Sequence, residues 1–359
     1  MNIGVIDLFC GAGGLTRGLE AEGLEVLAGF DLDPACRYPY EANNFSSFRL
    51  TDVAKIRASC LQAIWSGYEI RILAGCAPCQ PFSRYTQARA GQDNRWTLVQ
   101  AFSRLIGGTV PEIVTMENVP ELARHGVYRR FVDFLRRRKY FVSENIVECA
   151  DYGIPQQRRR LVLLASRLGP IDLVSPSSFG CEPSTVRQII EMMPKLAAGE
   201  ADEHDPIHRS SRLSPLNLKR IRASQPGGTW RDWSRKLVAA CHRREKGKGY
   251  ASVYGRMEWD HPAPTITTQA YGFGSGRFGH PQQDRALSLR EAAMLQTFPR
   301  DYAFVPRGKP VEMKTIGRLI GNAVPVRLGR IVARSINRHL DLSHNVDRDY
   351  PRHCENGLA

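Results

Sequence analysis

The 359-residue chain is long enough for one large domain and a smaller second one. Its formal net charge of +14 favours a polyanionic partner. Its apolar runs all fall short of the roughly 18 residues that a membrane-spanning helix needs. Nine scattered cysteines without a framework favour a reducing compartment. We therefore expect a cytoplasmic protein without a signal peptide or membrane contact.

The first predicted unit is a strand, a glycine turn and a helix. Residues 2–9 form a short apolar strand, residues 10–14 are rich in glycine, and residues 15–20 have helical spacing. Glycines let the backbone approach a ligand, and a helix N-terminus favours an anionic group. Gly11 and Gly13 are therefore candidates for binding a cofactor, although their spacing differs from that of dinucleotide-binding folds.

Two acidic residues follow this unit. Asp31 comes at the end of the second predicted strand, residues 25–30, where an acid can bind ribose hydroxyls. Asp52 begins the segment 52–56 and is a candidate for binding an adenine amino group. Either acid alone could instead cap a helix. Taken with the glycine turn, the two acids predict a cofactor site.

A cysteine follows the next predicted strand, residues 70–74. Prolines and a glycine in the sequence GCAPCQPFS, residues 75–83, stop regular structure and hold Cys79 in a stiff loop at the carboxyl end of that strand. A thiol placed there is a candidate nucleophile. The alternatives are a buried apolar cysteine, or a redox or zinc pair with Cys76. A second Cys-x-x-Cys that would complete a zinc site is missing from the sequence, so we expect no metal.

Further polar residues are predicted at the same edge of the sheet. After a polar loop (84–95) and a helix (96–106), the strand 111–116 is followed by Glu117 and Asn118. A carboxyl group beside an apolar strand end can act as a proton donor, although Glu117 could instead cap a helix. Gln156, Arg158 and Arg160 alternate ahead of the strand 161–165, which places them on one face.

The composition changes after about residue 170. Proline, serine and glycine increase, and aromatic and basic residues mix between residues 228 and 277. This mixture is typical of a nucleic-acid-binding surface, with a loop-rich β subdomain of no special function as the alternative. Helical spacing returns at 288–295, and a final helix is predicted from near Gly321 to about His339.

Six blocks in this order resemble the bacterial DNA (cytosine-5) methyltransferases, and the resemblance covers about residues 3–340. It implies an α/β fold, in which a Rossmann-like S-adenosylmethionine-dependent methyltransferase domain carries a smaller, loop-rich target-recognition domain. The implied catalytic domain consists of residues 1–175 and is completed by 315–345. The implied target-recognition domain is 176–285, joined through a hinge at 286–314, and a polar tail follows at 346–359. The blocks are DLFCGAGG at 7–14, PCQ at 78–80, ENV at 117–119, QxRxR at 156–160, residues 285–299, and GN at 321–322.

The resemblance also implies a role for each matching residue. Cys79 would add to carbon 6 of cytosine, and Glu117 would protonate or hydrogen-bond ring N3. Arg160 would contact the base, Arg158 would support Arg160 and its phosphate, and Asn118 would hold the loop. The residues implied to contact S-adenosylmethionine are Phe9, Gly11, Gly13, Asp31, Leu32, Asp52, Val53, Pro78, Leu98 and Asn322.

The implied activity is methyl transfer to carbon 5 of cytosine in a specific duplex DNA sequence, after the base has been flipped out of the helix. We expect the loop 83–95 to close over the site, double-stranded DNA and a cognate restriction system as partners, and a monomer. A tRNA cytosine-5 methyltransferase and a catalytically silent DNA-binding relative are the alternatives. The intact Cys79, Glu117 and Arg160 argue against the silent relative, and the basic, aromatic segment after Arg160 favours duplex DNA. The GCAPC form is one residue longer than the Gly-Phe-Pro-Cys form, which affects only the expected loop geometry.

Overall fold

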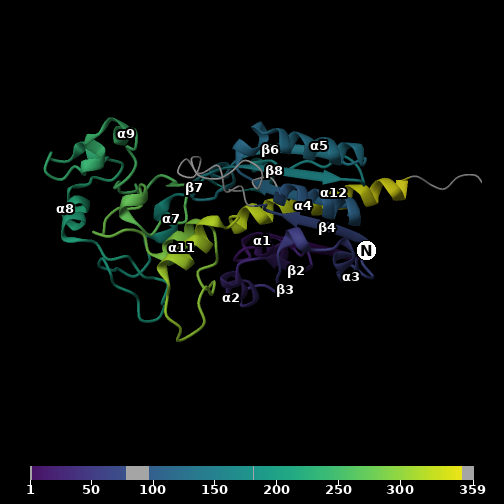
Figure 1. Ribbon diagram of the computed structural model, residues 1–359, viewed down its shortest axis with the longest axis horizontal. Helices are drawn as coiled ribbons and strands as arrows, with labels where there is room; N and C mark the ends of the chain where they lie inside the picture. The colour runs from purple at the N-terminus through teal and green to yellow at the C-terminus, as the bar shows by residue number, and fades with distance from the viewer. Residues whose placement is uncertain (1, 78–96, 181, 350–359) are drawn as a thin grey trace, which may run out of the picture.

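A computed structural model describes residues 2–77, 97–180 and 182–349 of the chain. Figure 1 shows a helix-covered sheet on one side and, at the far end, a region of few regular elements that carries α8 (Pro215–Ala223) and α9 (Glu245–Lys248). Between them lie α7 (Val186–Ile190) and α11 (Met313–Asn322). The predicted α/β class with a Rossmann-like sheet is confirmed.

The larger sheet places its strands in an order that reverses beside β1. Its five parallel strands end at β5, and β8 runs antiparallel to both of its neighbours. Open α/β sheets bind ligands at the carboxyl ends of the strands next to such a reversal. In spatial order the strands are β3 (Ser47–Leu50), β2 (Val26–Asp31), β1 (Ile3–Leu8), β4 (Ile70–Gly75), β5 (Ile113–Asn118), β8 (Arg159–Ser166) and β6 (Phe141–Glu148).

Helices cover both faces of this sheet. Because side chains of a strand alternate between faces, Ile6 and Leu8 face one layer and Val5 the other. The first layer consists of α3 (Ala58–Ile64), α4 (Thr97–Thr109) and α5 (Gly126–Arg137). The second consists of α1 (Gly14–Ala21) and α12 (Val326–Asp349), so the last helix completes the core that the first one begins.

The contact between α1 and α12 is close and charged. A Cβ added to Gly18 would lie 2.4 Å from the carbonyl oxygen of Val326, so only glycine allows this approach. Glu22, just after α1, receives a hydrogen bond of 2.7 Å from Arg330 Nε and one of 3.1 Å from Arg334 Nη2. The two helices are therefore held by backbone packing at one end and by ion pairs at the other.

The region beyond the sheet has small cores of its own. Trp230, Trp233 and Phe273 are buried with Ile221 in one apolar cluster. A two-stranded sheet, β7 (Gln156–Gln157) with β9 (Ala263–Pro264), joins this region to the end of the central sheet. The remaining helices are α2 (Arg37–Glu41), α6 (Pro176–Phe179) and α10 (Leu289–Leu295).

Several predicted boundaries differ from the observed ones. The predicted final helix begins later than expected. Gly321 and Asn322 are the end of α11, and α12 begins only at Val326, because Pro325 lacks the N–H that would continue α11 into α12. α12 continues to Asp349, past the boundary at residue 345, while the division into domains stays a prediction. Within the described ranges, each helix is too short or too polar to cross a membrane.

Candidate active site

The turn after β1 holds its main chain in the left-handed region. Phe9 has φ of 61° and Gly11 has φ of 54°. For a residue with a Cβ such as Phe9 this conformation costs roughly 1–2 kcal/mol, and such strain is concentrated at functional sites. A Cβ built on Gly11 would meet no heavy atom within 4 Å. The backbone is therefore open to a ligand at this point.

Asp31, the last residue of β2, braces the turn. Its Oδ2 accepts the Gly11 N–H at 2.9 Å, and its Oδ1 accepts the Asp33 N–H at 2.9 Å. Leu32 beside it is 66% exposed and presents an apolar surface next to the carboxylate. The structure thus brings Gly11, Asp31 and Leu32 together, and their open backbone, acid and apolar surface fit a nucleoside-containing cofactor.

The other predicted cofactor residues lie around this turn. Asp52 accepts the Ala54 N–H at 3.0 Å and caps a short 3-10 helix, so the capping interpretation is confirmed and contact with adenine stays a prediction. Phe9, Val53 and Leu98 share one apolar cluster on the side of α3, α4 and α5.

The end of α11 returns the chain to the same turn. Asn322 is exposed at this point. Val324 packs directly against Gly14, since a Cβ added to Gly14 would lie 2.3 Å from the Val324 carbonyl oxygen. Gly13, with φ of 88°, precedes α1 in the left-handed region. Pro78, Cys79 and the loop 83–95 lie outside the described residues.

Glu117 lies at the carboxyl end of β5, where it is 5% exposed. Cys76 Sγ donates to its Oε2 at 2.8 Å. Arg160 Nε lies 2.8 Å from Oε1 as a charge–charge contact, since Oε1 accepts no aligned hydrogen bond from the described residues. Glu117 is therefore a residue of the strand rather than a helix cap, because it pairs with Val162 of β8.

Asn118 fixes the chain that leads toward Cys79. Its Nδ2 donates to the Ala77 carbonyl at 2.9 Å, and its Oδ1 accepts the Val119 N–H at 2.8 Å. Since Ala77 is two residues before Cys79, this contact holds the start of the loop against β5. The geometry accords with the loop-holding role expected for Asn118, which stays a prediction.

Gln156, Arg158 and Arg160 all point inward, whereas Gln157 and Arg159 are exposed. Burial lowers the pKa of Arg158 to about 9. Its guanidinium donates to the carbonyl oxygens of Ile266 at 3.1 Å and Ala323 at 3.3 Å. It therefore connects three chain segments, whereas the sequence predicts support of Arg160 and a phosphate.

Gln156 makes a similar connection. Its Nε2 donates to the Leu295 carbonyl at 3.0 Å and to Gln296 Oε1 at 2.8 Å, and its Oε1 accepts the Ile266 N–H at 2.9 Å. The QxRxR block is thus the joint between the sheet, the segment around β9 and the end of α10.

Two groups near the site, the partly buried Cys76 and the buried Asp7, have no functional role in the sequence analysis. The sequence analysis considers Cys76 only as a redox or zinc partner of Cys79. In the structure its Sγ atom lies at the edge of the sheet and contacts Glu117. Asp7 is fully buried in β1, accepts the Thr16 hydroxyl at 2.7 Å with Oδ2, and has no partner for Oδ1 among the described residues. Burial and the charge of Asp31 raise the pKa of Asp7 to about 7. An acid inside an apolar strand is the sequence signal for such a group.

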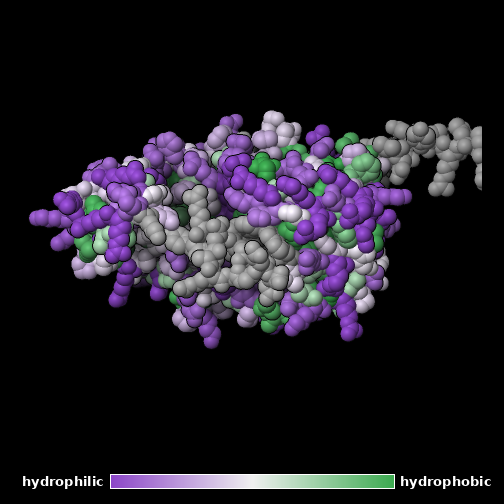
Figure 2. Space-filling model, turned by 45° about the horizontal axis from the view of Figure 1, so that its top comes forward, coloured by the Kyte–Doolittle hydropathy of each residue, from purple (hydrophilic) through white to green (hydrophobic). Residues whose placement is uncertain are grey.

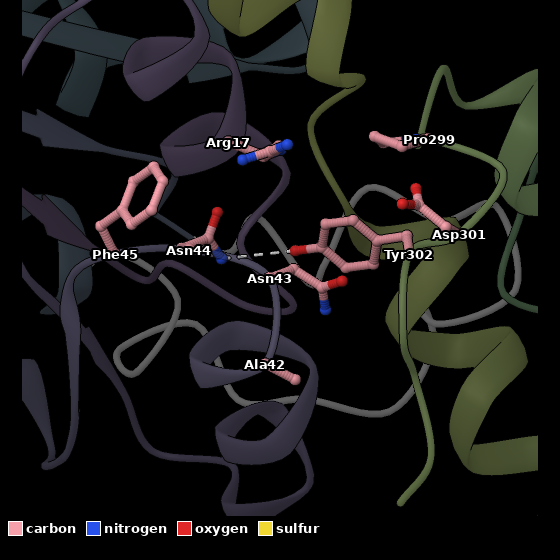
Figure 3. A pocket seen from close by; sticks show the side chains of 8 residues that line it. All are labelled: Arg17, Ala42, Asn43, Asn44, Phe45, Pro299, Asp301 and Tyr302. Atoms are coloured by element: carbon pink, nitrogen blue, oxygen red, sulfur yellow. Dashed lines mark hydrogen bonds between the residues drawn. The ribbon is translucent and has the colours of Figure 1, made fainter. Parts of the chain in front are cut away.

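A cavity of about 250 Å³ lies elsewhere, between α1 and the segment 299–302 (Figure 3). Asn44 and Tyr302 face each other there, with 3.4 Å between Asn44 Nδ2 and the Tyr302 hydroxyl, and Phe45 points away from both. Phe45 precedes β3, so the cavity lies toward the amino end of that strand. The Tyr302 hydroxyl also donates to the Ala12 carbonyl, so one wall of the cavity lies against the glycine turn.

In the region around α8 and α9, Trp230 and Trp233 are directed inward, whereas Tyr250 is 42% exposed. Trp230 stacks on His242 with 4.5 Å between ring centroids, and Trp233 Nε1 donates to Ser224 Oγ at 3.0 Å. The expectation of an aromatic–basic surface is thus only half met, because this end of the molecule presents mainly hydrophilic side chains (Figure 2). The exposed basic residues between 231 and 248 are Arg231, Arg235, Lys236, Arg243, Arg244 and Lys248.

Comparisons with known proteins show the family and the fold of the chain. The family model for C-5 cytosine-specific DNA methylases matches residues 3–338. The chain is 51% identical over 348 residues to the Type II methylase M.HgiDII of Herpetosiphon aurantiacus, covering 96% of this chain and 98% of that protein. Its fold resembles that of a putative DNA modification methyltransferase encoded within a prophage of E. coli, with a TM-score of 0.72 at 20% identity, covering 95% of this chain and 100% of that one.

Proposed function

The chain belongs to the C-5 cytosine-specific DNA methylases, and from this membership we propose that it transfers a methyl group from S-adenosylmethionine to carbon 5 of a cytosine in one duplex DNA sequence. The observation that carries the proposal is the carboxylate of Glu117, which Arg160 contacts at 2.8 Å at the edge where the Cys79 loop starts. An ionisable pair and a candidate nucleophile are what addition to a pyrimidine ring requires.

The chemistry starts with the Cys79 thiolate, because carbon 5 of cytosine is a weak nucleophile. The thiolate forms a bond to carbon 6, and the displaced electron pair moves toward ring N3, where Glu117 donates a proton or a hydrogen bond. General acid assistance of this kind typically contributes ~10²–10⁴-fold. Bound S-adenosylmethionine supplies an electrophilic methyl group for carbon 5. Carbon 5 then loses its proton to water, Glu117 takes back the proton or hydrogen bond at N3, and the bond between carbon 6 and sulfur breaks. This releases the Cys79 thiolate and restores the aromatic ring.

Arg160 supports this step through charge. Its guanidinium beside Glu117 keeps that side chain directed along the sheet edge, and its remaining donors can orient the base or the adduct. Arg158 acts at a distance, because its buried guanidinium joins the chain segments at Ile266 and Ala323. We assign Arg158 to positioning and Arg160 to substrate contact.

The cofactor residues are assigned to the open turn. Phe9, Gly11 and Gly13 would contact it through the main chain, and Asp31 would bind its ribose hydroxyls. The adenine would lie near Leu32, Asp52 and Val53. Leu98, Pro78 and Asn322 complete the set of residues proposed to hold it.

We assign sequence recognition to residues 176–285. The base must leave the duplex to reach Cys79, and unpairing and unstacking it costs a few kcal/mol. Contacts between a second region of the protein and the DNA would offset this cost. The exposed basic residues 231–248 suit phosphate contacts, which position the duplex, while polar side chains near them would read bases. Nine cysteines without a framework favour a reducing compartment, so we assign the protein to the cytoplasm. Similarity to a Type II methylase supports a cognate restriction enzyme as partner, and we propose that the protein acts as a monomer.

The proposal is tested with duplex DNA that carries 5-fluorocytosine. Wild-type protein should form an adduct that survives a denaturing gel, because fluorine at carbon 5 blocks the final elimination. The variant Cys79→Ala should form none while it binds S-adenosylmethionine normally. Bisulfite sequencing of DNA from cells that express the protein identifies the sequence and the base. Adduct formation by Cys79→Ala, or methylation of tRNA in preference to duplex DNA, would overturn the proposal.

A further inference from the structure

The residue after β4 is held rigidly at the edge of the sheet. The main-chain N–H of Cys76 donates to the Leu8 carbonyl at 3.2 Å, which extends the pairing of β4 with β1 by one residue. On its other side, the Ala77 carbonyl accepts the Asn118 side chain. These two hydrogen bonds fix the main chain at Cys76 and at the residue after it. The main chain at Cys76 is therefore held in place, unlike that of an open loop.

Strand register brings its thiol to the proposed general acid. Gly75 of β4 lies opposite Met116 of β5, so the next residue of each strand, Cys76 and Glu117, come side by side. The carboxylate then has one partner for each oxygen, since Cys76 Sγ lies 2.8 Å from Oε2 and Arg160 Nε 2.8 Å from Oε1. The partners differ in kind, one a neutral donor and one a cation.

The thiol acts as a donor to Glu117 here. Burial raises the pKa of Cys76 well above its ordinary value, and the neighbouring charge of Glu117 raises it further. The sulfur therefore keeps its proton and is a poor nucleophile. Of the two cysteines in the Cys-x-x-Cys sequence, Cys76 is the one that does not attack the base.

We propose that Cys76 is a positioning residue, whose S–H group holds Glu117 Oε2 and so sets the orientation of that carboxylate toward ring N3 of cytosine. The importance of this orientation rests on the proposed function. Without the thiol, the carboxylate can turn about its last side-chain bond and take the Arg160 guanidinium with both oxygens, an arrangement that arginine and carboxylate favour. Cys76 opposes that bidentate pair and keeps one oxygen directed away from Arg160.

Two substitutions separate donation from packing. Cys76→Ala removes the donor, and kcat should fall by about 10-fold to 100-fold, the range for a hydrogen bond to a charged group. Because orientation rather than binding is lost, KM for DNA and for S-adenosylmethionine should stay within about twofold. Cys76→Ser keeps a hydroxyl donor and should recover most of the lost kcat. Cys149→Ala is the matched control, because Cys149 is fully buried in the apolar cluster that Cys76 packs against.

A second measurement does not depend on turnover. The infrared S–H stretching band of Cys76, isolated as the difference between wild type and Cys76→Ser, should lie at the lower frequency of a hydrogen-bonded thiol. Glu117→Gln, which replaces the charged acceptor by a neutral amide, should move the band to higher frequency. A band that does not respond to Glu117→Gln, or a Cys76→Ser enzyme as slow as Cys76→Ala, would overturn the proposal. A wild type inactive on cytosine but with the expected band would overturn the proposed function alone.

Discussion

The substitution Asp7→Asn should make the protein more stable at neutral pH, and by an amount that depends on pH. Asp7 is fully buried, and its Oδ1 has no hydrogen-bond partner among the described residues. Its pKa is about 7 in the folded protein, compared with an ordinary value of 3.8. In the unfolded chain Asp7 therefore loses its proton near pH 4, while the folded protein retains it up to about pH 7.

The sign of the effect follows from proton binding. Between these two values the folded state binds more protons than the unfolded state, so stability falls as the pH rises. At about 1.4 kcal/mol for each pKa unit, the loss between pH 4 and pH 8 is at most about 4 kcal/mol. Asparagine has nearly the same shape, still accepts the Thr16 hydroxyl and cannot ionise, so Asp7→Asn abolishes this loss.

Urea unfolding followed by circular dichroism at pH 5, 6, 7 and 8 measures the free energy of unfolding of both proteins. The difference between them should grow in favour of Asp7→Asn by about 2–3 kcal/mol across this range, because only the two pH units between pH 5 and the folded pKa of about 7 contribute. Asp301→Asn, at an exposed position, is the control and should show no such trend. A difference that stays constant with pH would refute the reasoning, since another group would then be responsible.

Three further predictions concern the site and the helices behind it. Glu117→Gln should lower turnover by ~10²–10⁴-fold with little change in cofactor affinity, measured by single-turnover methyl transfer and by calorimetry. Asp31→Ala should do the reverse and weaken S-adenosylmethionine binding by about 1.5–3 kcal/mol, and equal losses of affinity in both variants would contradict this division of roles. Gly18→Ala should destabilise the protein by about 1–3 kcal/mol in a thermal melt, because the new Cβ would meet the Val326 carbonyl, whereas Gly249→Ala has open space around it and should be neutral.

Apolar runs in the sequence were sufficient to predict most of the central sheet. β1, β2, β4, β5 and β8 each contain such a run and are confirmed within one to two residues at most ends. β3 was missed because only Phe48 of its four residues is buried, which leaves no pattern to detect. Glu117 was placed after its strand because the antiparallel ladder with β8, which extends β5 to Asn118, is a contact between distant segments.

The candidate site shows the same division between local and long-range information. The glycine turn and Asp31 could be found because each is marked by its neighbours in sequence. The contact of Cys76 with Glu117 could not, since it depends on the register of two strands 41 residues apart. The inward direction of Trp230 and Trp233 was also beyond a local argument, because an aromatic residue among arginines can equally face a core or a ligand.

The docking of α12 on α1 also has a consequence for synthesis on the ribosome. Glu22 and its partner Arg330 are separated by 308 residues, so α1 emerges long before the helix that covers it. At about 5–20 residues per second, translation leaves that face of the sheet uncovered for roughly 15–60 s. During this time the nascent chain exposes an apolar surface that chaperones can bind. Enzyme activity should therefore appear only after the last helix has left the exit tunnel, which prevents methylation by unfinished chains.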